Sequence, residues 1–138
     1  MSGSDEQALV SAIYGFNWAK LKDLDRSFEA FAELIGPEFE MRLSPEIGSR
    51  VIRNLSELRN FANAIEQDFE ECTYAPREIL DATDGRVVVI GEIVARGRTS
   101  KLPLSGEFAH IWTIRSGRAV RAEAYRRPAD ALGAAGLS

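Results

Sequence analysis

The spacing of apolar residues divides the chain into a first half with the period of helices and a second half with the period of strands. In the first half, apolar residues recur every three or four positions in three segments, each preceded by a side chain that can cap a helix. The predicted helices cover residues 8–20, 26–35 and a segment that ends at about Glu71, with caps at Ser4, at Asp25, and at Asn54 or Ser56. Gly36-Pro37 ends the second helix, and the alternation of residues 39–43 predicts a short strand after it.

Beyond Pro76 the period changes to two, which predicts a mostly antiparallel sheet. Its strands are expected at residues 78–81, 87–98, 106–114 and 119–126. Two of the links, Thr83-Asp84-Gly85 and Arg115-Ser116-Gly117, suit three-residue hairpins made of a type I turn followed by a left-handed glycine. Helices followed by a run of strands are typical of an α+β domain in which the helices pack on one face of the sheet.

The second hairpin predicts which residues share a face of the sheet. A three-residue loop pairs Ile114 with Arg118, and the pairing then continues along both strands. The predicted partners are Trp112 and Val120, His110 and Ala122, and Phe108 and Ala124. This register makes one face apolar, with a single imidazole in it. The tail, residues 128–137, is rich in alanine and is expected to form a short cover or an oligomer contact.

Composition and charge narrow the class of protein. The 138 residues suffice for one domain, expected over residues 1–138, and 45% apolar with 28% charged residues is typical of a globular chain. The longest apolar run, residues 87–90, is far shorter than the roughly 18 residues of a membrane span. The net charge of −4 disfavours nucleic acid as a partner. A lone Cys72 forms no intramolecular disulfide and no signal peptide is recognised, so we expect a cytoplasmic location.

Several motifs point to a known fold. They are Pro37-Glu38-Phe39-Glu40, the hairpin Asp84-Gly85-Arg86-Val87-Val88-Val89, Gly97-Arg98, the run from Gly106 to Arg118, and the closing segment from Ala131 to Leu137. Together with the order of elements, they resemble the SnoaL-like branch of the NTF2-like superfamily, the cone-shaped fold of polyketide cyclases, ketosteroid isomerases and limonene epoxide hydrolases. The resemblance implies a curved sheet around a long first helix, an apolar pocket open at one end, and a homodimer formed through the back of the sheet.

The resemblance also implies roles for single residues. Tyr14 lies where the steroid isomerases carry their oxyanion tyrosine, and His110 lies where they carry a protonated aspartic acid. Residues 39–44 contain no aspartate to serve as their base, which disfavours their mechanism. In the polyketide cyclases a histidine on this strand helps to position the substrate, and His110 matches it. The aspartate–arginine–aspartate set of the epoxide hydrolases has no match, because no aspartate accompanies Glu92 and Arg96.

His110 is the strongest candidate for chemistry, because it is the only histidine and an imidazole titrates near neutral pH. Burial would lower its pKa and keep it neutral, able to act as a base or to bind an oxygen. Tyr14 is the candidate donor to a ligand carbonyl. Both residues have a purely structural alternative, His110 as a hydrogen-bonded packing residue and Tyr14 as part of the packing seam of its helix.

Large side chains on the same elements are predicted to contact a ligand, although core packing explains them equally well. They are Trp18, Met41, Phe61, Phe108 and Trp112. Arg126 shares strand parity with Ala124 and is expected at the pocket rim, where it would attract an anionic group. Glu92 and Arg96 share one strand face. If that face is concave, Glu92 is a partner for His110 or a base; if it is convex, the two form a surface pair, which we favour.

These residues support two hypotheses. The first is an enzyme that carries out cofactor-free proton transfer, isomerisation or cyclisation on a small lipophilic carbonyl compound, with His110 as acid or base. The second is a non-catalytic binding or dimerisation module that uses the same cavity. No metal site is expected, because one histidine and Cys72 lack any metal-binding spacing. A homodimer is expected, since a monomer would expose a partly apolar back face made of Ala109, Ile111, Thr113 and Tyr125.

Overall fold

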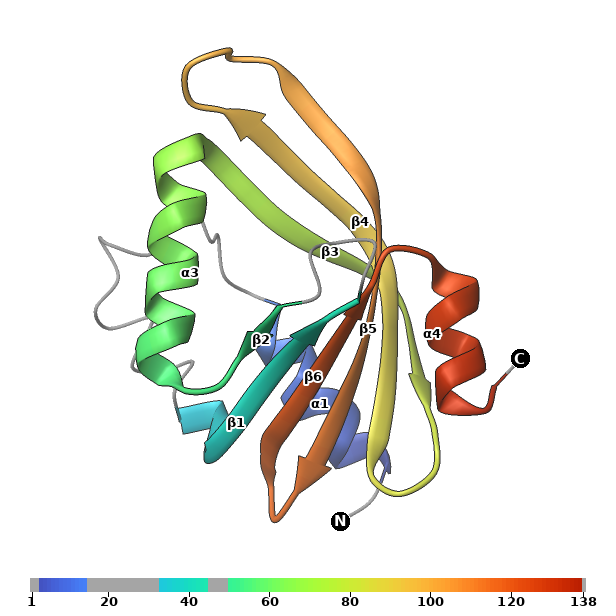
Figure 1. Ribbon diagram of the computed structural model, residues 1–138. Coiled ribbons are helices and arrows are strands. Elements are labelled where there is room, and N and C mark those ends of the chain that lie inside the picture. Colours follow the sequence, from blue (N-terminus) through green and yellow to red (C-terminus); the bar gives the residue numbers. More distant parts are fainter. Residues whose placement is uncertain (1–2, 15–32, 45–49, 138) are drawn as a thin grey trace.

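The fold is built on one sheet of six strands with helices on both of its faces (Figure 1). The computed structural model describes residues 3–14, 33–44 and 50–137. Within them the helices are α1 (Gly3–Ile13), α3 (Leu55–Asp68) and α4 (Pro128–Ala135). The strands are β1 (Ile35–Leu43), β2 (Val51–Ile52), β3 (Phe69–Asp81), β4 (Arg86–Gly97), β5 (Pro103–Arg115) and β6 (Arg118–Tyr125). The predicted α+β class is confirmed.

The sheet is mostly antiparallel, and its order is β2-β1-β6-β5-β4-β3. The exception is the pairing of β1 with β6, which is parallel and brings Met41 next to Ala122. The strand β1 therefore joins the sheet beside a strand that is far from it in the sequence. As a result, β1 extends the inner face of the sheet beyond β6 and the long antiparallel strands β5 and β4.

Alternation along β4 and β5 sends side chains into two separate apolar clusters. On the inner face, residues of both strands pack with Val10 and Ile13 of α1 and with Leu58 of α3. On the outer face, their neighbours in sequence pack with Ala131 and Ala135 of α4. The helices α1 and α3 thus lie on one side of the sheet and α4 lies on the other (Figure 1).

The three predicted helices are described to different extents. The helix α1 covers the start of the first, whose remainder lies outside the described residues. Of the second, residues 26–32 lie outside them, Glu33 and Leu34 are helical, and Ile35 already belongs to β1. Asn54 caps α3, because its side chain accepts a hydrogen bond of 2.9 Å from the backbone N–H of Glu57. The helix ends at Asp68 rather than at about Glu71, since Phe69 is already extended and pairs with Gly97 of β4. No helix in the described part of the chain is long and apolar enough to cross a membrane.

The strand β3 begins well before the predicted boundary at Pro76. It spans Phe69–Asp81 and lies at the edge of the sheet, where a residue without an N–H is tolerated. The register with β4 shifts between Pro76 and Glu78, so a bulge absorbs the proline. The predicted boundary is therefore wrong, and Tyr74 belongs to the sheet.

The strand β1 also begins earlier than predicted. It spans Ile35–Leu43 and contains Gly36-Pro37, which were expected to separate a helix from the strand. The register with β6 shifts between Ile35 and Glu40, so the proline lies where the ladder is interrupted. The two-residue strand β2, which pairs Ile52 with Met41, is too short to leave a pattern in the sequence.

Both hairpin turns have a geometry that differs from the predicted one, because two residues in each are left-handed rather than the glycine alone. The φ angles are 61° and 72° at Asp84 and Gly85, and 53° and 77° at Ser116 and Gly117. In the second hairpin Arg115 pairs directly with Arg118 across a two-residue loop. The predicted three-residue loop is wrong at this hairpin.

A bulge in β6 compensates for the shorter loop. Ile114 pairs with Ala119 and Thr113 with Arg121, which leaves Val120 without a partner in the ladder. The extra residue restores the parity that a two-residue loop would reverse, so the predicted inner face of β5 is retained. Two features differ from the prediction. The buried Ala119 takes the inward place expected for Val120, and the partners of the β5 residues are shifted along β6. Trp112 now lies opposite Ala122, and His110 opposite Ala124.

The tail forms α4, which covers part of the back of the sheet. Ala109 and Ile111 are buried beneath this helix. Arg86 fixes the end of α4, since its guanidinium donates to the carbonyl oxygens of Ala134 and Ala135 at 3.3 and 3.4 Å. The expectation that Ala109 and Ile111 are exposed in a monomer is therefore wrong. The homodimer stays a prediction without support from these two residues.

Candidate functional site

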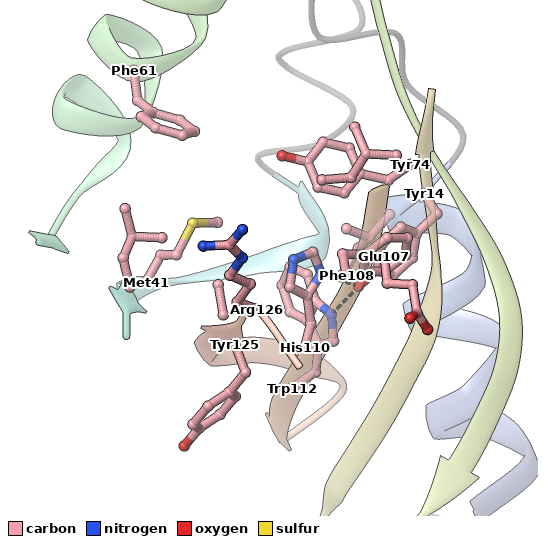
Figure 2. A pocket seen from close by; sticks show the side chains of 14 residues that line it. Tyr14, Met41, Phe61, Tyr74, Glu107, Phe108, His110, Trp112, Tyr125 and Arg126 are labelled. Atoms are coloured by element: carbon pink, nitrogen blue, oxygen red, sulfur yellow. Dashed lines mark hydrogen bonds between the residues drawn. The ribbon is translucent and has the colours of Figure 1, made fainter. Parts of the chain in front are cut away.

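A cavity of about 290 Å³ opens on the inner face of the sheet, with walls from α1, α3 and all strands except β2. Its size is near the lower end of the roughly 300–1,000 Å³ of small-molecule sites. Seven of the predicted site residues line it (Figure 2): Tyr14, Met41, Phe61, Phe108, His110, Trp112 and Arg126. The eighth, Trp18, lies outside the described residues.

Three of these side chains form a hydrogen-bonded chain that joins α1 to β5. The indole Nε1–H of Trp112 donates to the hydroxyl oxygen of Tyr14 at 2.7 Å. The same oxygen lies 2.6 Å from Nδ1 of His110. Trp112 and His110 are two residues apart on one strand, and Tyr14 follows directly after α1. The chain therefore depends on how the helix docks on the sheet.

The direction of each hydrogen bond follows from the chemistry of the three groups. An indole N–H only donates, so Tyr14 accepts from Trp112 and retains its own O–H as a donor. If Tyr14 donates to Nδ1 of His110, the indole N–H, the hydroxyl group and Nδ1 all have partners. The opposite tautomer would leave the Tyr14 O–H without an acceptor among the described residues. We therefore assign the proton of His110 to Nε2, which no described residue engages.

Burial keeps both titratable members of the chain neutral. It lowers the pKa of His110 to about 3, which agrees with the predicted direction. It raises the pKa of Tyr14 well above its ordinary value, and the hydrogen bond from Trp112 offsets part of that rise. An imidazole with so low a pKa is a poor proton acceptor near neutral pH. The arrangement favours hydrogen-bond donation from Nε2 over general-base catalysis.

Tyr74 is a cavity residue that sequence reasoning missed, because the strand was expected to begin after Pro76. Its ring lies with centroids 5.2 Å from Phe108 and 5.5 Å from His110. Figure 2 shows its hydroxyl directed toward the side of the cavity where Phe61 lies. Burial raises the pKa of Tyr74 to about 12, so the phenol stays protonated. No described residue is hydrogen-bonded to this hydroxyl, which leaves it as a second donor to the cavity.

Charged residues on β4 and β5 lie mainly outside the cavity. Glu92 is bound to Arg77 at 3.3 Å and Arg96 to Glu70 at 3.6 Å, both at exposed positions. The predicted surface position of Glu92 and Arg96 is therefore correct, but the two are paired with other residues and not with each other. Glu107 borders the cavity, but its carboxylate is held by Arg77 at 3.3 Å.

Metal-binding groups do not gather in the part of the chain that the structure describes, where no cluster of three or more His, Cys, Asp or Glu side chains is arranged to hold an ion. Cys72 lies in a separate apolar cluster with Ala95, between α3 and the sheet. Burial raises the pKa of the Cys72 thiol to about 11, so it stays protonated and weakly nucleophilic.

An open sheet with a small apolar cavity beneath its helices defines an α+β protein with an internal ligand-sized site. No family model and no curated protein matches the sequence. Among solved structures, a Jannaschia protein described as a SnoaL-like polyketide cyclase aligns with a TM-score of 0.74 at 12% identity, over 100% of this chain and 96% of the other. TerC, co-crystallised with polyporic acid, aligns with a TM-score of 0.71 at 22% identity, over 97% of this chain and 99% of the other. An NTF2-like protein of Burkholderia pseudomallei aligns with a TM-score of 0.72 at 18% identity, over 98% of each chain.

These alignments show that the chain has the NTF2-like fold. The resemblance to SnoaL-like proteins seen in the sequence is thus confirmed at the level of the fold.

Replacing Tyr14 by phenylalanine is expected to lower the free energy of unfolding by about 2 kcal/mol, because it leaves Trp112 Nε1 and His110 Nδ1 without partners. It should also remove the preference of His110 for the tautomer with its proton on Nε2. Urea denaturation measures the first effect and nitrogen NMR of the imidazole the second. Tyr125→Phe is the matched control, because it removes a hydroxyl bound only to the partly exposed Glu123, and it should cost less than about 1 kcal/mol. Equal losses in both variants would contradict a structural role for the chain.

Proposed function

We propose that the chain binds a small lipophilic carbonyl compound in this cavity and promotes cofactor-free proton transfer at the carbon beside the carbonyl. One observation carries the proposal: the chain from Trp112 through Tyr14 to His110 leaves a neutral imidazole with its Nε2–H as a donor. A hydrogen bond from this donor stabilises the negative charge that the carbonyl oxygen gains when a proton leaves the neighbouring carbon.

The polar side chains of the cavity take other roles than the sequence predicts. Tyr14 orients His110 rather than the ligand, because its O–H is used by Nδ1. Tyr74 takes the place of the second donor, with a hydroxyl that no described residue engages. The apolar walls, including Phe61 and Phe108, supply the contact area that a lipophilic ligand needs.

Proteins of similar structure support a site for small organic molecules. TerC was crystallised with polyporic acid, and the Jannaschia protein is described as a polyketide cyclase. A protein from Bacillus subtilis with a TM-score of 0.67 at 14% identity is described as an isomerase. Each description belongs to that protein, and it supports the class of ligand proposed here rather than a particular compound.

A non-catalytic binding module is the second candidate, and the carboxylates favour it. Of the described residues that line the cavity, Glu107 alone carries a carboxylate, and that group is held by Arg77 at 3.3 Å with 55% of its side chain exposed. The first strand, where the steroid isomerases carry their base, supplies no carboxylate to the cavity. Its Glu40 is bound to Arg42 and borders a groove on the outer face. A proton acceptor for turnover would then have to be water or a group of the ligand.

Exchange of the carbon-bound protons of β-tetralone with heavy water separates the two candidates. Proton NMR is expected to show faster loss of the protons beside the carbonyl with the wild-type protein than with His110→Asn, which keeps an acceptor for Tyr14 but lacks Nε2. Glu92→Gln, a change at the exposed surface, should leave the rate unchanged.

Binding is followed separately through the Nε2–H signal of His110. β-Tetralone should shift this signal, whereas tetralin, which has the same rings but no carbonyl, should not. A shift without faster exchange would identify a non-catalytic module. If tetralin shifts the signal as strongly as β-tetralone, the role of His110 as a donor to a carbonyl is wrong.

A further inference from the structure

Arg126 brings a positive charge to the rim of a cavity whose other walls are mainly apolar. It directly follows β6 and shares strand parity with Ala122 and Ala124, so its side chain leaves the sheet on the inner face. Figure 2 shows the side chain extending into the space that Met41 and His110 also face.

The guanidinium of Arg126 has no counter-ion in the part of the chain that the structure describes. Several other arginines of the sheet are engaged by carboxylates or by carbonyl oxygens, namely Arg77, Arg96, Arg98 and Arg121. Glu107, the acidic group at the cavity wall, is held by Arg77 instead. No described carboxylate therefore competes with a ligand for the charge of Arg126.

We propose that the ligand is an anionic carbonyl compound, whose carboxylate binds Arg126 at the rim while its carbonyl oxygen accepts a hydrogen bond from His110. The inference rests on the proposed function and names the class of compound that the site takes. A guanidinium offers two parallel N–H donors that match the two oxygens of a carboxylate. The apolar body of the ligand would fill the space between the two polar ends, against Phe61 and Phe108.

The overall charge of the protein does not explain the proposed attraction of Arg126 for an anionic ligand. With a net charge of −4, the chain as a whole repels anions, so a preference for an anionic ligand must come from groups at the site. Arg127 provides an internal comparison. It is exposed like Arg126 and adjacent to it, but it does not line the cavity.

The test compares the dissociation constants of β-tetralone and of a β-tetralone that carries a carboxylate on its aromatic ring. Wild-type protein is expected to bind the acid roughly fivefold to tenfold more tightly than the neutral ketone. Arg126→Gln should abolish this preference, so that the acid and the ketone bind with similar affinity. Arg127→Gln, which makes the same change in net charge, should retain the preference.

Two further measurements test the inference even if the Arg126→Gln variant does not fold. Arg126→Lys keeps the charge without the paired donors and should retain part of the preference. For the wild-type protein, raising the ionic strength from about 0.01 M to about 1 M should weaken binding of the acid much more than binding of the ketone, because the Debye length falls from about 30 to about 3 Å.

The outcomes distinguish this inference from the function on which it rests. If neither compound binds, the proposed function fails and the inference fails with it. If the ketone binds and the acid binds no more tightly, the proposed function stands and the anionic ligand is excluded. Equal loss of the preference in Arg126→Gln and Arg127→Gln would assign it to general charge rather than to a rim site, and would also overturn the inference.

Discussion

Lowering the pH from about 7 to about 5 is expected to remove about 2 kcal/mol from the free energy of unfolding, through the single histidine of the chain. Burial lowers the pKa of His110 to about 3 in the folded protein, whereas an unfolded histidine titrates near 6.5. The unfolded chain therefore takes up a proton that the folded chain refuses. The contribution is fully present above the unfolded pKa, and it is lost progressively as the pH falls toward the folded pKa.

Urea denaturation at a series of pH values measures this effect. The interval above about pH 5 is decisive, because the carboxyl groups of an unfolded chain titrate mainly near pH 4. His110→Asn should show a nearly flat free energy of unfolding over the interval, since it retains an acceptor for Tyr14 and cannot take up the proton. The same slope in the variant and in the wild-type protein would show that other groups are responsible, and a His110 that titrates normally would remove the basis of the proposed chemistry.

Replacing Gly91 by alanine is expected to destabilise the protein by about 3 kcal/mol or more. An added Cβ would meet the backbone carbonyl oxygen of Ala75 at 2.0 Å and a ring carbon of Phe108 at 2.9 Å. Gly91 is paired with Pro76, next to the bulge of β3, so the carbonyl is part of the backbone and cannot rotate away as a flexible side chain would. Relief of the contact requires β3 to move away from β4.

The matched control is Gly106→Ala on the neighbouring strand. A Cβ added at Gly106 meets nothing within 4 Å, so this change should leave the stability within about 1 kcal/mol of the wild-type value. Urea denaturation gives both values. A loss at Gly91 no larger than that at Gly106 would mean that the close approach of β3 to β4 is incorrect. Because β3 carries Tyr74, the Gly91 variant should also bind β-tetralone more weakly.

Local patterns in the sequence predict most of this fold. The caps and spacing locate α3, and alternation locates β4, β5 and β6 to within a few residues. The errors occur where a non-local pairing outweighs a local signal. Pro76 is a strong local breaker, but the edge strand β3 continues through it with a bulge. The parallel pairing of β1 with β6 has no local signature, because it joins segments that are far apart in the sequence.

The candidate site is predictable in its membership but not in its hydrogen bonds. Alternation along β5 is enough to place Phe108, His110 and Trp112 on one face. The contact of Tyr14 with His110 spans 96 residues and depends on the docking of α1, which no spacing encodes. The direction of donation, and hence the tautomer of His110, follows only once Trp112 is known to donate to the same hydroxyl.

The parallel pairing of β1 with β6 also determines when the cavity can form during synthesis. Met41 and Ala124 both line the cavity, yet β1 has only the two-residue strand β2 as a partner until residues 118–125 have left the ribosome. In a nascent chain that ends before this point, the edge of β1 that pairs with β6 has no partner, and the apolar side chains of Phe39 and Met41 lie on that strand. Unpaired strand edges and uncovered apolar side chains make partly folded chains prone to aggregate, and we expect ligand to enter the fold only after translation has reached β6.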